Sequence, residues 1–315
     1  MKIVILDIGT LGEGLNFDSI SKLGEVVAYD VSTQAQIEER IKDADVVIAN
    51  KMELCEDNLK NAKNLKLICV TATGYDNIDI EYCKKNGIGV CNVVGYSTDS
   101  VVQLTVALAF SLATNLYTFD KYVKSGAYTK SGIFNSVSPV FHEISGLTWG
   151  IVGLGNIGKK VAKIADAMGC RVLAYKRTDD PEYNCVDIDT LCRESDIITV
   201  HTPLNDGTFH LINEEKLSKM KEKVILVNVA RGAVFDEEAV CRAVENGKIG
   251  GLGVDVYSSE PMKEQSPYQR ILARENVIFT PHMAWGAIES RQRCIDEVAK
   301  NIETFINGAK RSRIV

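Results

Sequence analysis

Three side chains that could share one acid–base reaction, Arg231, Glu260 and His282, each come shortly after an apolar run of strand length. An arginine can hold a carboxylate and polarise a neighbouring carbonyl, because its guanidinium is planar and always charged. A histidine can donate a proton near neutral pH, and a carboxylate on its other ring nitrogen would favour the imidazolium form. Alone, each residue is more often structural; together they predict reduction of a 2-oxo acid, with His282 protonating the oxygen as hydride arrives.

A glycine pattern, Gly153-x-Gly155-x-x-Gly158, lies between an apolar run that includes Trp149 and a stretch with apolar residues at helical spacing. This strand–turn–helix setting is typical of dinucleotide-binding folds. Gly153 would permit the tight turn, Gly155 would let a pyrophosphate approach the backbone, and Gly158 would let the helix pack on the strand. The helix that begins near Asn156 offers unpaired N–H groups to the phosphates. A glycine-rich turn without a ligand is the simpler alternative.

Polar residues also follow the later strand candidates, where an open parallel sheet binds its ligands. These residues are His201-Thr202-Pro203-Leu204, Ala230-Arg231-Gly232, Asp255 and Pro281-His282. We therefore expect one edge of the sheet to carry both the cofactor and the reacting groups.

The second strand of the nucleotide-binding fold, expected over 171–175, lacks the acidic residue that usually holds the ribose hydroxyls of NAD. Lys176, Arg177 and Thr178 stand there instead. Two cations and a hydroxyl would suit a 2′-phosphate, so the sequence favours NADP(H) over NAD(H). Alternatively, Asp179 and Asp180 reach the ribose in a loop that folds back, and the two cations face solvent.

The elements that must position these residues form two alternations of strand and helix, which predict α/β architecture with two doubly wound parallel sheets. The strands expected in the first sheet are 2–6, 26–29, 46–49, 67–70 and 88–91. The strands expected in the second are the run at Trp149, then 171–175, 196–200, 224–229, 252–256 and 277–280. The second sheet is the Rossmann cofactor domain, and the first belongs to a smaller, flavodoxin-like domain.

Two long helical patterns set the expected domain boundaries. A mostly apolar helix over about 97–116 would carry the chain from the first domain to the second, and a helix over about 287–306 would return it. We expect a discontinuous substrate domain of residues 1–98 and 286–315, and a dinucleotide-binding domain of residues 99–285. Residues 117–141 are expected to be a looser aromatic segment, and the glycine-rich stretch 9–14 a simple loop.

Bulk composition excludes several classes of function. The chain has 315 residues, of which 45% are hydrophobic, and a net charge of −6. Because the net charge is negative, the protein has no overall positive field that would attract nucleic acid or an anionic membrane. Its nine cysteines are scattered without a C-x-x-C pair, and we expect reduced thiols, no metal site and a cytoplasmic location. The N-terminus does not have the pattern of a signal peptide, and no run of 18 apolar residues occurs.

Six motifs in order give the chain a resemblance to the D-isomer-specific 2-hydroxyacid dehydrogenase family along nearly its whole length. They are Thr73-Gly74-Tyr75-Asp76-Asn77-Ile78-Asp79, Gly153 to Gly158, His201-Thr202-Pro203-Leu204, Asn228-Val229-Ala230-Arg231-Gly232, Gly253-Val254-Asp255-Val256 with Glu260-Pro261, and Thr280-Pro281-His282. The resemblance implies a catalytic set of Arg231, Glu260 and His282, a homodimer joined through the larger domains, and a small 2-oxo or 2-hydroxy acid as substrate.

The resemblance also implies the remaining contacts. The expected cofactor-binding residues are Thr98, Gly153, Gly155, Asn156, Ile157, Gly158, Lys176, Arg177, Thr178, His201, Thr202, Pro203, Val229, Ala230, Asp255 and Ala284. The expected substrate-binding residues are Thr73, Gly74, Arg231, His282 and Trp285. Among these, the loop at Thr73 and Gly74 would hold the substrate carboxylate, and Asp255 would contact the nicotinamide.

Within the family, residues 95–101 and the run His282-Met283-Ala284-Trp285 resemble the glycerate dehydrogenase or hydroxypyruvate reductase branch. Trp285 would then lie beside the substrate, unless it only caps the domain junction. We expect NAD(P)H-dependent reduction of a hydroxypyruvate-like or glyoxylate-like acid to the D-2-hydroxy acid. The alternatives are a nucleotide-sensing binding protein of the same fold and a formate or phosphonate type of dehydrogenase. The formate enzymes carry Gln where Glu260 stands.

Overall fold

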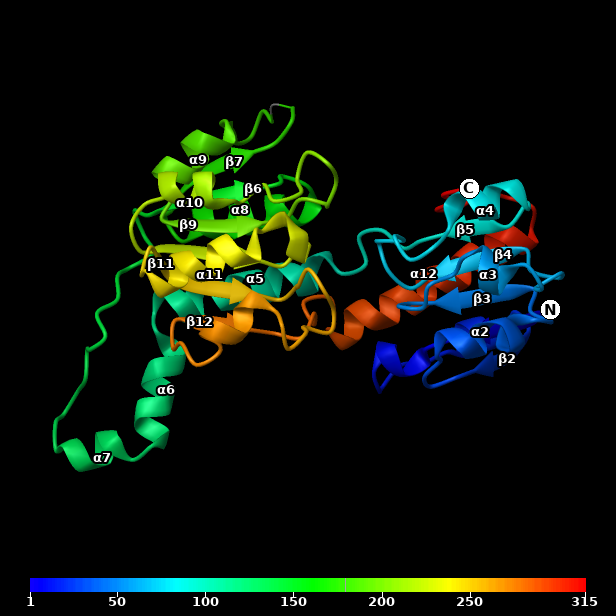
Figure 1. The fold of residues 1–315 in the computed structure, drawn as a ribbon, viewed down its shortest axis with the longest axis horizontal. Coiled ribbons are helices and arrows are strands. Elements are labelled where there is room, and N and C mark those ends of the chain that lie inside the picture. The colour runs from blue at the N-terminus through cyan, green and yellow to red at the C-terminus, as the bar shows by residue number, and fades with distance from the viewer. Residues whose placement is uncertain (179) are drawn as a thin grey trace. The chain divides into compact units, whose positions relative to one another are not determined.

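The computed structural model describes residues 1–178 and 180–315, which form two compact units. Unit 1 comprises Met1–Ser97 and Trp285–Val315, and unit 2 comprises Thr98–Ala284. Each unit has its own parallel sheet with helices packed against it (Figure 1). The predicted fold class of two parallel-sheet α/β domains is confirmed. Trp285, expected to be the last residue of the cofactor domain, lies in unit 1.

Unit 1 has a five-stranded sheet of order β2-β1-β3-β4-β5. Its strands are β1 (Lys2–Ile5), β2 (Glu25–Ala28), β3 (Val46–Ala49), β4 (Leu67–Val70) and β5 (Gly89–Cys91). Its helices are α1 (Asp18–Ser21), α2 (Gln34–Ile41), α3 (Glu56–Leu59), α4 (Ile80–Lys85) and α12 (Ile288–Ile306), with a short 3₁₀ helix, η1 (Ile8–Leu11). Every residue of β3 and β4 is buried, because helices cover both faces of the sheet.

Alternating side chains divide the core of unit 1 into two layers. Val47 and Ile68 point into the layer that contains α2, whereas Val46 and Leu67 point into the layer covered by α12. The long return helix expected at the C-terminus is therefore part of this core.

Unit 2 has a seven-stranded sheet of order β12-β11-β10-β9-β6-β7-β8. The strands are β6 (Thr148–Val152), β7 (Arg171–Tyr175), β8 (Asn184–Cys185), β9 (Ile197–Val200), β10 (Val224–Asn228), β11 (Ile249–Val254) and β12 (Val277–Phe279). The chain runs outward from β6 in one direction and from β9 in the other. This reversal creates a switch point at the carboxyl ends of β6 and β9, where such sheets bind ligands.

Helices α5 and α8 cover unit 2 near the switch point. The helices of the unit are α5 (Thr98–Ala113), α6 (Leu116–Lys124), α7 (Ala127–Ser131), α8 (Asn156–Ala167), α9 (Ile188–Glu194), α10 (Glu214–Lys219) and α11 (Glu237–Glu245), with 3₁₀ helices η2 (Gly232–Val234) and η3 (Pro267–Ile271). A Cβ added at Gly253 would lie 3.2 Å from Cβ of Leu108, so a glycine lets α5 pack close to β11.

Three local predictions are wrong. The helix expected over 97–116 ends at Ala113, because Asn115 adopts a left-handed conformation with φ 51° before α6 begins. The segment 117–141, expected to be loose, contains most of α6 and all of α7, which extend away from the sheet in Figure 1. The stretch 9–14, expected to be a loop, begins inside η1.

Among the described residues, no single helix is long and apolar enough to cross a membrane. Helices α5 and α6 meet the length and composition test only as a pair, across a bend of 67°.

Candidate functional site

The carboxyl ends of three neighbouring strands in unit 2 bring the predicted catalytic region together. Arg231 follows β10 and precedes η2, Asp255 follows β11, and His282 comes three residues after the end of β12. Since β10, β11 and β12 are adjacent and parallel, these residues share one edge of the sheet.

Glu260 and His282 form a direct pair. The Oε2 atom of Glu260 lies 2.6 Å from Nδ1 of His282, and the two side chains are 34% and 27% exposed. The carboxylate accepts at Nδ1, so this bond sets the orientation of the ring and directs Nε2 away from Glu260. His282 has φ 51°, a conformation uncommon for a residue other than glycine, which points to a constrained position.

The loop that carries Glu260 packs against the residue after Arg231. A Cβ at Gly232 would lie 1.9 Å from the carbonyl carbon of Tyr257, so only glycine allows this approach. The N–H of Tyr257 donates to Oε1 of Glu260 at 3.1 Å. The Arg231 backbone is fixed from the other side, because Nδ2 of Asn228 donates to its carbonyl at 2.9 Å. The structure thus holds Arg231 and Glu260 on two loops in contact.

Asp255 is fully buried and anchors the segment that contains His282. Its carboxylate accepts hydrogen bonds from the hydroxyl of Thr280 and from the N–H groups of Met283 and Ala284, the latter two at 2.9 Å. Burial raises the pKa of Asp255, against the effect of these donors. These bonds make Asp255 a positioning residue for His282. Its expected contact with the nicotinamide stays a prediction.

The glycine turn between β6 and α8 fits a dinucleotide. A Cβ at Gly153 would lie 2.8 Å from backbone atoms of His201 and Thr202, and one at Gly158 would lie 2.1 Å from the Gly153 carbonyl oxygen. By contrast, no atom of residues 1–178 or 180–315 lies within 4 Å of a Cβ built on Gly155. No side chain of the described residues caps the start of α8, which leaves the N–H groups of its first turn, including those of Asn156 and Ile157, for a ligand.

His201 supports this turn mainly through its backbone, whose N–H donates to Val152 at 2.7 Å. Its Nε2 lies 3.0 Å from the hydroxyl of Thr199, which also accepts from Nε1 of Trp149 at 3.2 Å. Its Nδ1 is buried without a hydrogen-bond partner among the described residues. Burial lowers the pKa of His201 to about 3. The ring is therefore neutral at physiological pH. Sequence reasoning missed Thr199, although a threonine within an apolar strand was a usable signal.

At the end of β7, Lys176, Arg177 and Thr178 were expected to stand together as a site for a 2′-phosphate, and the structure shows a further partner for Lys176. Arg177 and Thr178 are exposed, but the amine of Lys176 lies 3.3 Å from Oδ2 of Asp180. The same oxygen lies 2.7 Å from the amine of Lys159 on α8. Asp180 thus folds back onto two lysines, while Asp179 lies outside the described residues. Lys159 was not predicted.

In unit 1, the expected carboxylate-binding loop follows β4. The hydroxyl of Thr73 donates to Val93 at 2.8 Å, and Nδ2 of Asn92 donates to the Thr73 carbonyl at 2.7 Å. Among the described residues, the N–H groups of Thr73 and Gly74 have no hydrogen-bond partner. Such N–H groups can bind a carboxylate. Trp285 packs against the core layer of α12, and its role toward substrate stays a prediction.

The remaining predicted cofactor residues also follow strands or begin a helix of unit 2. Thr98 is the first residue of α5, Thr202 and Pro203 follow β9, and Val229 and Ala230 follow β10.

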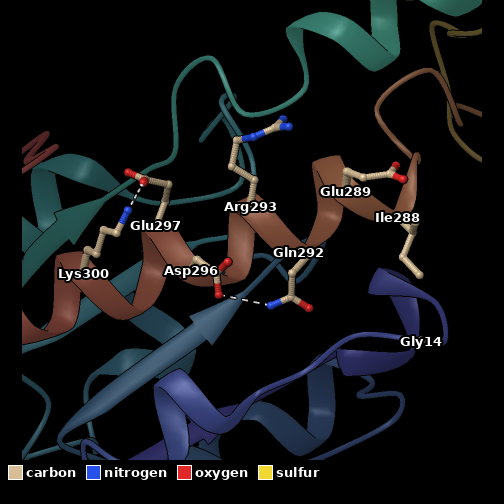
Figure 2. Close-up of a pocket in the computed structure, with 8 residues that line it drawn as sticks. All are labelled: Gly14, Ile288, Glu289, Gln292, Arg293, Asp296, Glu297 and Lys300. Atoms are coloured by element: carbon tan, nitrogen blue, oxygen red, sulfur yellow. Dashed lines mark hydrogen bonds and ion pairs between the residues drawn. The ribbon is translucent and has the colours of Figure 1, made fainter.

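A polar groove of about 510 Å³ along α12 does not gather comparable chemistry (Figure 2). Its polar side chains pair along the helix: the amine of Lys300 lies 2.8 Å from Glu297, and the amide of Gln292 donates to Asp296 at 3.1 Å. Arg293 donates to the carbonyl of Tyr96.

The neutral state of the half-buried His201 ring predicts how stability depends on pH. The folded-state pKa lies below the unfolded value of 6.5, so the unfolded chain binds the extra proton between about pH 6.5 and 3. Stability is then lost as pH falls through this window. Lowering the pH from 7 to 5 should cost the wild type about 2 kcal/mol more than it costs His201→Gln, measured by urea unfolding.

The exposed His142 provides the control, since His142→Gln should keep the pH dependence of the wild type. Equal pH dependence in His201→Gln and the wild type would show that His201 is not held neutral by burial.

Comparison with known proteins supplies the family. The model of the D-isomer specific 2-hydroxyacid dehydrogenase NAD-binding domain matches residues 106–284. A hydroxypyruvate reductase of Blautia hydrogenotrophica is 36% identical, with 98% of each chain covered. A glycerate dehydrogenase of Methylorubrum extorquens is 38% identical, with 88% of this chain and 87% of that one covered.

A solved structure of an acyclic imino acid reductase in complex with NADPH and D-Arg superposes with a TM-score of 0.86, at 28% identity and full coverage of both chains. Together with the glycine turn and the strand-end residues, these matches establish a nicotinamide-dependent oxidoreductase. The chain belongs to the D-isomer specific 2-hydroxyacid dehydrogenase family, in the branch of the glycerate dehydrogenases and hydroxypyruvate reductases.

Proposed function

We propose that the enzyme reduces a small 2-oxo acid, of the hydroxypyruvate or glyoxylate kind, to the D-2-hydroxy acid. The observation that carries the proposal is the 2.6 Å pair of Glu260 and His282 on loops next to Arg231. The names of the relatives support the substrate class. This pair and the approach of its loop to Gly232 support a shared role for Arg231, Glu260 and His282 at one substrate.

The proposed roles follow from the chemistry of each side chain. The bound cofactor supplies the hydride. Arg231 holds the substrate carboxylate and polarises the carbonyl, because its fixed charge and planar donors match both oxygens. His282 donates a proton to that oxygen from Nε2, while Glu260 at Nδ1 stabilises the imidazolium. In unit 1, the N–H groups of Thr73 and Gly74 are proposed to bind a carboxylate.

Removing the carboxylate of Glu260 tests these roles. In Glu260→Gln the imidazolium form of His282 loses its anionic partner, so the pH optimum for reduction should move downward. His282→Gln should lower kcat by roughly 10²- to 10⁴-fold, the usual contribution of a positioned proton donor. Both are measured by loss of absorbance of the reduced cofactor with hydroxypyruvate and glyoxylate.

Glu222→Gln, which alters an exposed glutamate just before the start of β10, away from the strand ends that carry Arg231 and His282, should leave both kcat and the pH profile unchanged. An unchanged pH profile in Glu260→Gln would remove Glu260 from the mechanism. If the wild type oxidises no reduced cofactor with any 2-oxo acid, a nucleotide-sensing role replaces the enzymatic one.

We propose further that the enzyme prefers NADP(H). Lys176, Arg177 and Thr178 stand where an acidic residue would hold the ribose of NAD, and one structural neighbour binds NADPH.

The ratio of kcat/KM for NADPH and NADH with one 2-oxo acid measures this preference. We expect an advantage for NADPH of about tenfold or more, because charge-assisted bonds to the 2′-phosphate are strong. A tenfold advantage for NADH would contradict the proposal.

We also propose that the chain forms a homodimer through the arm of unit 2, which comprises residues 116–147 and is seen below the sheet in Figure 1. The arm carries a concentration of exposed large apolar side chains. They are Leu116, Tyr117, Val123, Ile133, Phe134, Val137, Val140 and Phe141. Phe134 is 92% exposed, and a concentration of exposed apolar side chains of this kind supports a protein–protein contact.

Sedimentation velocity tests the dimer. The wild type should sediment at twice the chain mass, and the double variant Phe134→Asp, Val140→Asp should sediment as a monomer. Phe209→Asp, which alters a 58% exposed phenylalanine outside the arm, should remain a dimer. A wild type that sediments as a monomer would disprove the proposal.

A further inference from the structure

Asp180 is the centre of a three-residue charge cluster at the end of β7. Its side chain is only 3% exposed, and its Oδ2 lies 2.7 Å from the amine of Lys159 and 3.3 Å from that of Lys176. Its Oδ1 accepts from the N–H of Glu182 at 3.2 Å. Both carboxylate oxygens are thus engaged by protein groups.

These contacts do not suit Asp180 as a ligand of ribose hydroxyls. A ribose-binding acid needs accessible oxygens, whereas Asp180 is buried beneath two ammonium groups. The bond to Lys159 is the main reason why the pKa of Asp180 is lowered, so the carboxylate is an ionised counterion.

The two lysines come from the two elements that bound the adenosine end of a dinucleotide. Lys159 directly follows Gly158 in the first turn of α8, and Lys176 directly follows β7. The N–H of Gly153 donates to the carbonyl of Tyr175 at 3.0 Å, which ties the glycine turn to the end of β7. The lysine amines therefore meet between the pyrophosphate turn and the strand end that reads the ribose.

We propose that Lys159 and Lys176, gathered on Asp180, form a cationic site for the 2′-phosphate of the cofactor, with Lys159 as a specificity-determining residue. The two lysines and Asp180 carry one net positive charge, and Arg177 adds another. A 2′-phosphate brings negative charge that both ammonium groups can share with Asp180. A 2′-hydroxyl brings none, and it meets no accessible carboxylate at Asp180. This inference rests on the proposed preference for NADP(H).

Binding of adenosine 2′,5′-bisphosphate and of adenosine 5′-monophosphate, measured by calorimetry, tests the cluster without turnover. In Lys159→Gln the Kd of the bisphosphate should rise by about tenfold, as expected for loss of one charge-assisted bond, while that of the monophosphate stays within about twofold. The matched control is Lys163→Gln, one turn further along α8, which removes the same charge from an exposed lysine and should change neither Kd by more than about twofold.

The variant Asp180→Asn distinguishes a role of Asp180 as counterion of the lysines from a role as ligand of the ribose hydroxyls. We expect the Kd of NADH to stay within about twofold of the wild type, because Asp180 does not bind the ribose. A tenfold weaker NADH complex with an unchanged NADPH complex would overturn the proposal.

Equal weakening of both adenosine ligands in Lys159→Gln, or no weakening of either, would also overturn it. The ratio of the Kd of NADPH to the Kd of NADH in the wild type tests the proposed cofactor preference independently of Lys159. A wild type that prefers NADPH while Lys159→Gln keeps the bisphosphate affinity overturns the proposed cationic site and leaves the proposed cofactor preference standing. A wild type that prefers NADH refutes the proposed cofactor preference itself.

Discussion

Unit 2 depends on the close approach of backbone segments at three glycines, Gly153, Gly158 and Gly232. At each of them a Cβ would lie within 2.8 Å of another backbone atom, a distance that no side chain tolerates. Gly153 brings the glycine turn against the segment at His201, Gly158 brings α8 against the carbonyl of Gly153, and Gly232, next to Arg231, admits the loop of Glu260. The cofactor site and the proposed catalytic set therefore rest on the same kind of contact.

A second constraint is the use of carboxylates, the buried Asp255 and the partly exposed Glu260, to hold backbone and side-chain groups in place. Asp255 accepts from the N–H groups of Met283 and Ala284, and so it fixes the residues that follow His282. Glu260 accepts from the N–H of Tyr257 with one oxygen and meets His282 with the other. Each carboxylate is satisfied by groups within unit 2, which keeps the histidine in one orientation before any ligand binds.

Much of this arrangement could be predicted from the sequence because parallel sheets gather residues at strand ends. Glycine spacing and polar residues after apolar runs were enough to indicate Gly153, Arg231 and His282. Side-chain partners were harder, since Thr199 and Lys159 act through contacts between elements distant along the chain. The helices of the arm were not predicted because α6 has no buried residue. Burial against a core produces the apolar periodicity by which helices are recognised in a sequence, and α6 is not subject to it. Asp180 shows both what could be predicted and what could not. That its loop folds back was considered as an alternative, but its ion pair with Lys159 on α8 was not predicted.

The most direct test of the account is the fate of the transferred hydride in a single reduction. Hydroxypyruvate is reduced with NADPH that carries deuterium at the transferring position of C4, and the glycerate is analysed by NMR and chiral chromatography. The account predicts D-glycerate with one deuterium at C2, since a bound substrate meets cofactor and His282 in one fixed orientation. L-glycerate, or glycerate without deuterium at C2, would contradict it.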